Sequence, residues 1–164
     1  MRQYNTDLAS LYLNSSSLDE EWLGVNRNKS NVILVAIDAS EHSNKAFKYA
    51  CVLTRNSESH LQILHVIEDY VNVGYSITRE LENTGNKLLH KYEARARSVG
   101  LLSVNTILAR GNPAEEILKI ADKKYVNTIV VGSRGRYASS SDYLLGSTSY
   151  KLAHYSKCTV VIVK

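Results

Sequence analysis

The chain has 164 residues, of which 44% are hydrophobic and 22% charged, and it contains a single proline. This length fits one domain, and the composition excludes a disordered chain, a collagen-like repeat and a disulfide scaffold. Lysines and arginines outnumber aspartates and glutamates by 20 to 16. The resulting charge of +4 suits an anionic ligand but is too weak to indicate a nucleic-acid partner. No apolar run approaches the roughly 18 residues of a membrane helix, so we expect no membrane partner.

Residues 1–30 differ in composition from the rest of the chain. They are rich in Asn and Ser, and three basic against four acidic residues give them a charge of −1, which leaves +5 for the remainder. This pattern predicts a loosely attached N-terminal arm or linker with one short helix near residues 5–13. An arm that swaps onto a partner subunit is the alternative. The N-terminus has no uninterrupted apolar segment behind a basic start, so we expect no secretory signal.

Two cysteines, Cys51 and Cys158, lie far apart and have no CxxC spacing. The simplest interpretation is two buried thiols in a reduced cytoplasmic protein. The five histidines show no metal-ligand spacing, so we expect no protein-held metal site.

From residue 31 onward, apolar runs alternate with segments of helical character. Short, mostly apolar runs predict strands, the most apolar of them buried on both faces; they are Asn31–Ile37, Leu61–Ile67, Val104–Ala109, Thr128–Val131 and Thr159–Val163. Helical spacing or capping signals mark the intervening segments; they are Ser40 to about Thr54, residues 75–99, a helix from Asn112 and Pro113, and residues 147–155. This alternation predicts an α/β fold, a single-domain doubly wound five-stranded parallel sheet with helices on both faces.

Ligands of such a sheet bind outside the carboxyl ends of the strands, where the strand order reverses. The first strand ends at Asp38, and the fourth runs into Gly132–Gly135 (GSRG), with Gly146–Ser149 (GSTS) at a later helix start. Glycines allow close approach of a ligand, and free N–H groups beside small hydroxyls form an anion site suited to a nucleotide phosphate. On spacing alone, these glycines could equally serve to make turns.

These residues also carry a family resemblance. Residues 31–164 resemble the universal stress protein family in the segments NVILVAIDASEHS, LHVIED, GNPAEEIL and VVGSRG…LLGSTS…VVIVK. The family's fold is a five-stranded parallel sheet of order 3-2-1-4-5. Its ATP-binding members carry Gly, two residues, Gly, nine residues, and Gly followed by Ser or Thr. Here ten residues separate Gly135 from Gly146, so this chain has one extra residue within positions 136–143.

The resemblance implies an adenine nucleotide, ATP or AMP, as ligand. It implies that Asp38 accepts a hydrogen bond from the nucleoside, that the backbone of Val66 faces the adenine, and that the glycine-rich segments lead to and cradle the phosphates. The implied nucleotide-binding residues are Ala36, Ile37, Asp38, Val66, Gly111, Val131, Gly132, Ser133, Arg134, Gly135, Gly146, Ser147, Thr148 and Ser149. Any Mg²⁺ would be held through phosphates and water. The alternative for Asp38 is a helix-capping acid, and Arg136 is a weaker candidate than Arg134 for a phosphate contact.

The resemblance implies a stress-response regulatory module rather than a dedicated enzyme. A related superfamily that adenylates its substrates has a glycine-rich loop after the first strand, whereas residues 38–41 (DASE) contain no glycine. No general base near a γ-phosphate is evident, because Asp142 is the only acid in the loop, so at most slow ATP hydrolysis is expected. The other alternative is an interaction module that has lost nucleotide binding.

The last strand, Thr159–Val163, is apolar, with nearby charges only at Lys157 and Lys164. In the order 3-2-1-4-5 it lies at a sheet edge, where unpaired N–H and C=O groups favour pairing with another chain. Family members commonly pair through this strand, so the resemblance implies a homodimer. The alternative is that residues 1–30 fold back and cover the edge.

Overall fold

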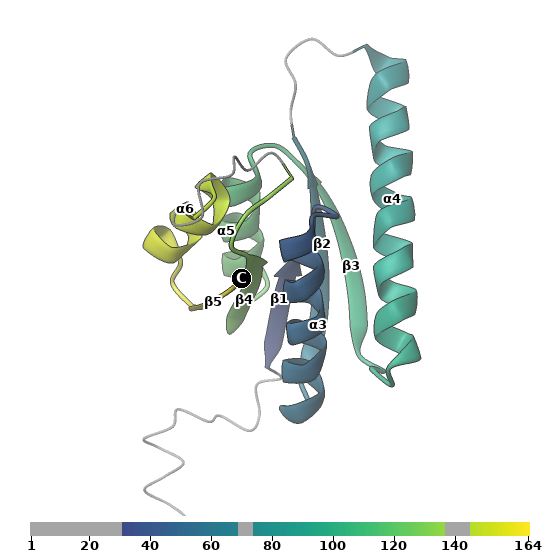
Figure 1. Ribbon diagram of the computed structural model, residues 1–164. Coiled ribbons are helices and arrows are strands. Elements are labelled where there is room, and N and C mark those ends of the chain that lie inside the picture. The colour runs from purple at the N-terminus through teal and green to yellow at the C-terminus, as the bar shows by residue number, and fades with distance from the viewer. Residues whose placement is uncertain (1–30, 69–73, 137–144) are drawn as a thin grey trace, which may run out of the picture. The chain divides into compact units, whose positions relative to one another are not determined.

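The computed structural model describes residues 31–68, 74–136 and 145–164. Within these residues, strands and helices alternate along the chain (Figure 1). The strands are β1 (Val32–Ala36), β2 (His60–Ile67), β3 (Val104–Arg110), β4 (Thr128–Gly132) and β5 (Thr159–Val163). The helices are α3 (Glu41–Asn56), α4 (Tyr75–Ser98), α5 (Pro113–Lys123) and α6 (Ser147–Tyr155). The helix expected near residues 5–13 and all of segment 136–143 except Arg136 lie outside the described residues.

The strands form one parallel sheet in the order β3-β2-β1-β4-β5, which confirms the predicted topology. The chain moves outward from β1 to β2 and β3, and then returns to pair β4 and β5 on the other side of β1. The strand order therefore reverses between β1 and β4, where such sheets bind ligands. Element boundaries differ from the predictions by one or two residues, as expected for frayed ends.

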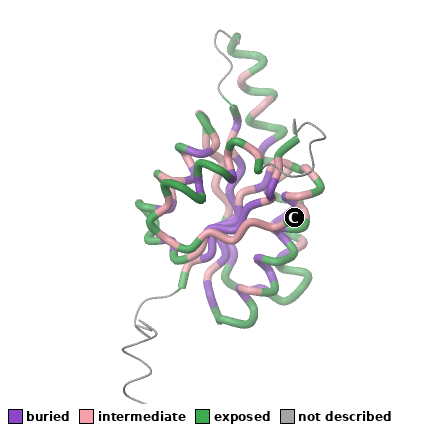
Figure 2. The backbone as a smooth tube through the Cα atoms, turned by 60° about the vertical axis from the view of Figure 1, so that its left-hand side comes forward, coloured by how far each residue is buried: buried purple, intermediate pink, exposed green. Residues whose placement is uncertain are grey.

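Two apolar cores hold the sheet, one on each face, because successive strand side chains point to opposite sides. On one face, Val35 and Ile63 pack with Phe47 of α3 and Tyr92 of α4. On the other face, Leu34, Leu64 and Ile129 pack with residues of α5 and α6. Buried residues accordingly follow the strands through the centre of the domain in Figure 2. No helix in the described ranges is both long and apolar enough to span a membrane.

The prediction of two buried thiols is half right. Cys51 is buried in the core beneath α3, and burial raises the pKa of its thiol to about 11, although the charge of Arg95 opposes this shift. Cys158 is only half-buried, because it precedes the edge strand β5, where no further strand covers it. Both thiols are free.

The two edges of the sheet are protected differently. At the β3 edge, Arg97 of α4 donates from Nη2 to the carbonyl of Val104 at 3.2 Å and is held by Glu93 at 2.8 Å. At the β5 edge, the Thr159 N–H and the Val163 carbonyl bond toward β4, so the backbone groups of alternate residues point outward. No side chain in the described part of the chain bonds to these outward groups. As far as the described residues show, the β5 edge is therefore the open one.

Candidate functional site

A cavity of about 780 Å³ opens at the carboxyl ends of β1, β2 and β4, where the strand order reverses. Its volume lies within the range typical of small-molecule sites. The starts of α5 and α6 line it on one side, and the middle of α4 lines it on the other. Of the fourteen residues predicted for a nucleotide site, all except Gly111 and Ser133 line this cavity.

Gly111 and Ser133 have backbone roles beside the cavity. The φ of Gly111 is 140°, a conformation that favours glycine, and its N–H donates to the carbonyl of Ile67 at 3.0 Å. Ser133 is only 4% exposed, and its N–H donates to Val163 at 2.7 Å. Its carbonyl accepts from the N–H of Gly146 at 2.8 Å. Ser133 thus joins the end of β4 to β5 and to the start of α6.

The carboxylate of Asp38 is held from several directions. One oxygen, Oδ1, accepts the N–H of Ser40 at 2.9 Å, and Oδ2 accepts the N–H of Arg136 at 3.0 Å. Burial disfavours the charged form, but these hydrogen bonds and those of Ser43 outweigh it, so the pKa of Asp38 lies below its usual value of 3.8. Asp38 does not itself cap α3, because the Oγ of Ser40 accepts the N–H of Ser43 at 3.1 Å.

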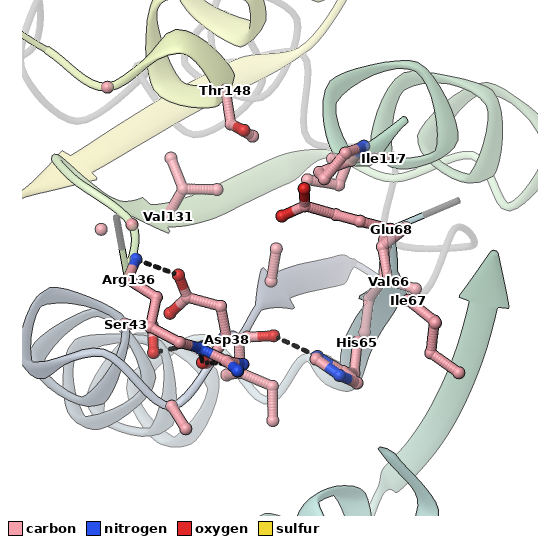
Figure 3. Close-up of a pocket in the computed structure, with 18 of the residues that line it drawn as sticks. Asp38, Ser43, His65, Val66, Ile67, Glu68, Ile117, Val131, Arg136 and Thr148 are labelled. Atoms are coloured by element: carbon pink, nitrogen blue, oxygen red, sulfur yellow. Dashed lines mark hydrogen bonds between the residues drawn. The ribbon is translucent and has the colours of Figure 1, made fainter. Parts of the chain in front are cut away.

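Arg136 makes a contact that the sequence pattern did not predict. Its guanidinium donates to the carbonyl oxygen of Asp38 from Nε at 3.0 Å and from Nη2 at 2.6 Å. The close-up in Figure 3 shows Arg136 and Asp38 facing each other at one end of the cavity. Residues 133–136, which follow β4, are therefore tied through Arg136 to the turn that follows β1.

Gly132 is required by packing, whatever the cavity holds. A Cβ at this position would lie 2.7 Å from the backbone carbonyl carbon of His42 and 2.8 Å from the nitrogen of Ser43. These are backbone atoms of α3, which cannot move aside as a flexible side chain could. Glycine here allows the end of β4 to lie directly against the first turn of α3.

Gly146 is different, because nothing among the described residues requires glycine there. A Cβ would meet Arg134 and Ser133 at 3.4 and 3.5 Å, which is close to ordinary contact, and the φ of −64° suits any residue. As the N-cap residue of α6, Gly146 has no side chain to accept the first N–H groups of that helix. Ser149 does not help, since its hydroxyl donates inward to the carbonyl of Ser133 at 2.9 Å. Ser147 and Thr148 line the cavity, and their N–H groups have no acceptor within the helix or among the other described residues.

The floor of the cavity between β1, β2 and β4 is apolar. Val131 and Ile117, which are 4% and 2% exposed, face each other across it, and Val66 lies beside them (Figure 3). The side chain of Glu68, at the end of β2, reaches over this floor in the same view. An apolar slot with a carboxylate at its border suits a flat ring that carries hydrogen-bond donors.

Several lining residues were missed by sequence reasoning. Ile117 and the α4 residues follow an ordinary apolar helical spacing, which indicates core rather than a site; the α4 residues are Leu81, Thr84, Gly85 and Leu88. His65 is a buried residue with a satisfied ring nitrogen: it is 9% exposed, and its Nδ1 lies 2.8 Å from the carbonyl oxygen of Ile37. In the described ranges, no three His, Cys, Asp or Glu side chains gather as metal ligands would.

A doubly wound parallel sheet with a glycine-lined cavity at its switch point is the architecture of α/β proteins that bind ligands at this place. Residues 29–164 match the universal stress protein family. Over 148 residues the chain is 37% identical to universal stress protein YxiE of Bacillus subtilis, an alignment that covers 82% of this chain and 99% of that protein. The chain therefore belongs to the universal stress protein family, as the resemblance of its motifs predicted.

Solved structures share the fold at lower identity. A universal stress protein in complex with cAMP superposes with a TM-score of 0.66 at 23% identity, covering 82% of this chain and 97% of that one. The universal stress protein of Archaeoglobus fulgidus in complex with dAMP gives a TM-score of 0.62 at 16% identity, covering 83% and 98%. These likenesses show that the fold is shared.

Proposed function

We propose that this protein is a regulatory module of the stress response that binds an adenine nucleotide, ATP or AMP, in the cavity at the strand ends. One observation carries the proposal. The start of α6, which has no side-chain cap, lines the same cavity as a fixed carboxylate and an apolar slot. A phosphate requires an anion site, a ribose hydroxyl requires a hydrogen-bond acceptor, and an adenine base requires an apolar slot.

The apolar slot is the proposed place of the adenine. The side chains of Ile117 and Val131 would contact the two flat faces of the adenine. Ala36, Ile37 and the backbone of Val66 border the slot. Asp38 lies at the edge of this slot, and its two oxygens each accept one hydrogen bond from the protein. A carboxylate oxygen has further lone pairs, so Asp38 can still accept from a ribose hydroxyl.

The phosphates are proposed to lie at the start of α6. The N–H groups of Ser147 and Thr148 and the positive end of the helix favour negative charge there. Gly146 allows close approach because it has no Cβ, and Arg134 and Gly135 line the same end of the cavity. The structures of family members with cAMP and dAMP support this ligand class, since both ligands are adenine nucleotides on the same fold.

Calorimetric titration with ATP, AMP and adenosine tests the proposal. Binding to the folded state alone also raises the free energy of unfolding, by about 2.7 kcal/mol at a ligand concentration one hundred times Kd. Absence of both heat and thermal stabilisation at millimolar nucleotide would reject the proposal. The alternative function, an interaction module that has lost nucleotide binding, would then be favoured.

Gly146→Ala tests the phosphate end separately. The protein has room for the added methyl group, so loss of binding would reflect the ligand's need for that space. We expect ATP affinity to fall by about tenfold, equivalent to 1.4 kcal/mol, with adenosine affinity retained. Gly74→Ala is the matched control, because Gly74 is the N-cap residue of α4 with nearly the same φ and ψ and nothing within 4 Å of an added Cβ. Equal losses in both variants would contradict the assignment.

A Mg²⁺ ion, if bound, is proposed to be held by phosphates and water. Asp38 and Glu68 are the acids that line the described part of the cavity, and Asp142 lies outside the described residues. We expect ATP turnover to be slow at most, because no described acid is paired with a nucleophile or base as a catalyst would need. Titration in Mg²⁺ and in EDTA, followed by phosphate release, measures both properties.

We also propose a homodimer formed through the open β5 edge. The outward-pointing backbone groups of β5 and its half-buried β-branched side chains support pairing with a second copy. Ile162→Pro removes one outward N–H without touching a bond to β4, so we expect light scattering to report a monomer. Ile162→Val, which retains the N–H, should remain dimeric. A wild-type monomer would refute the dimer.

The cytoplasm is the compartment we propose for this protein. Two free cysteines, one of them deep in the core, support a reducing environment. Cell fractionation with an antibody to the protein tests this, and recovery from the culture medium would contradict it.

A further inference from the structure

Among the described residues, Arg136 hydrogen-bonds to a single residue, Asp38, which is 98 positions away in sequence. Three hydrogen bonds join them: one from the backbone N–H of Arg136 to the carboxylate and two from its guanidinium to the carbonyl oxygen. Among the described residues, no other group donates to that carbonyl. This contact is therefore specific to the pair.

The backbone after β1 is arranged so that this carbonyl is accessible. Ala39 has a φ of 66°, in the left-handed region that residues with a side chain seldom adopt. This turn takes the carbonyl of Asp38 out of both the sheet and α3, and strained turns of this kind persist only when the surroundings hold them. A planar guanidinium holds the N–H groups of Nε and Nη2 side by side, so both can donate to one carbonyl oxygen.

We propose that Arg136 is a positioning residue, whose guanidinium fixes Asp38 at the nucleoside end of the cavity and holds residues 133–136 beside it. This inference rests on the proposed function, in which Asp38 binds the ribose. Arg136 then acts through Asp38, so its removal weakens every ligand that has the nucleoside part, whether or not it carries phosphates.

The competing role for Arg136 is direct contact with a phosphate. Nε and Nη2 each donate to the carbonyl oxygen of Asp38, so a phosphate contact made without releasing Asp38 would use the remaining N–H groups of Nη1 and Nη2. The two roles give different ligand profiles. A positioning residue changes the affinities for adenosine, AMP and ATP by one common factor, whereas a phosphate ligand changes the affinity for ATP and leaves that for adenosine unaltered.

The experiment is calorimetric titration of adenosine, AMP and ATP into the full chain and its variants. For Arg136→Gln we expect a common loss of about fivefold to tenfold, the effect of one or two hydrogen bonds. Arg136→Lys should lose nearly as much, because an ammonium keeps the charge without the planar fork. Arg55→Gln, which removes one exposed positive charge at the far end of α3, is the matched control and should bind as the wild type. A loss confined to ATP, or full rescue by lysine, would overturn the proposal.

A second measurement does not depend on nucleotide. In the wild type, NMR should show slow exchange of the Arg136 amide proton and a carboxyl titration of Asp38 below pH 3.8. In Arg136→Gln, we expect this exchange to accelerate and the titration midpoint to rise, while Arg55→Gln changes neither. Unchanged exchange and titration would overturn the proposal. If the wild type binds no nucleotide, the proposed function fails, and these two measurements still decide whether Arg136 fixes Asp38.

Discussion

Helices α3 and α6 begin at the same end of the sheet, but they differ in whether a side chain accepts hydrogen bonds from the N–H groups of the first turn. At α3, the Oγ of Ser40 accepts the N–H of Ser43, and Ser43 in turn bonds to the backbone of Asp38. At α6, the N-cap residue is Gly146, and the hydroxyl of Ser149 donates inward to the carbonyl of Ser133. Among the described residues, the start of α3 therefore has a side-chain cap, whereas that of α6 has none.

This difference separates structural features from candidate binding features in one loop region. Gly132 supports α3, since its missing Cβ leaves room for the backbone of His42. At Gly146, by contrast, an added Cβ would approach the described residues no closer than 3.4 Å, yet this residue lines the cavity. Two glycines of one sequence motif therefore have different reasons to be glycine, and substitutions can test each reason.

Gly132→Ala should have the largest effect on stability. The added Cβ would overlap the α3 backbone at 2.7 Å, so we expect a loss of about 3 kcal/mol in the free energy of unfolding, at the upper end for overpacking. Urea denaturation measures this loss. Gly146→Ala should change the same quantity by less than about 1 kcal/mol, since a poorer N-cap is offset by a less flexible unfolded chain. Similar losses in the two variants would contradict the distinction.

Ser40→Ala removes the cap of α3 and should cost about 1 kcal/mol. Thermal unfolding followed by circular dichroism measures the loss. The variant should bind ATP within about twofold of the wild type, because Ser40 does not line the cavity and its backbone N–H still bonds Asp38. A large loss of ATP affinity with an unchanged melting temperature would assign Ser40 to the site instead.

Gly146→Asp gives α6 the kind of cap that α3 has. A carboxylate at the N-cap accepts an N–H of the first turn and favours the helix dipole, so we expect a gain of about 0.5 kcal/mol in stability. The same carboxylate would occupy the proposed phosphate site, so ATP affinity should be lost. Gly146→Ser supplies a neutral cap and separates occupation of the site from charge repulsion. Undiminished ATP binding by Gly146→Asp would reject α6 as the phosphate site.

The smallest expected effect is the pH dependence due to Asp38. Its pKa is lower in the folded protein than the usual 3.8, so its carboxylate stabilises the fold above that pH. This stabilisation is lost as the pH falls through the lower, folded pKa. Comparison of unfolding free energies at pH 6 and pH 3 for the wild type and Asp38→Asn isolates the effect, which should be absent in the variant. Equal pH dependence in both proteins would show that other acids dominate.

Much of the fold could be predicted because its signals are local. Continuous β-branched runs such as Val32–Ala36 identify buried strands, and Asn112 before Pro113 marks the start of α5. The strand order came from the family resemblance. Most of the residues in the motif do line one cavity. The motif did not predict that the carbonyl of Ser133 accepts hydrogen bonds from the N–H of Gly146 and the hydroxyl of Ser149.

The contact of Arg136 with Asp38 could not be predicted for a physical reason. It depends on the positive φ of Ala39, a conformation that alanine rarely adopts. It also depends on a contact between residues 98 positions apart in the sequence. Ile117 was missed because a residue that lines an apolar slot has the same helical spacing as one that fills a core. The sequence thus indicates polar and glycine residues at turns, but it does not distinguish an apolar residue that lines a cavity from one that fills the core.

The unequal edges of the sheet limit how far the protein can assemble. With Arg97 bound to the carbonyl of Val104, the β3 edge is poorly suited to receive another strand, and β5 is the remaining surface for growth. A sheet extended by one neighbour across a two-fold axis would then present only β3 edges at both ends. If the proposed dimer forms in this way, growth would stop at two copies, and an open-ended filament would be avoided. Arg97, which does not line the cavity, would then limit extension of the sheet at β3.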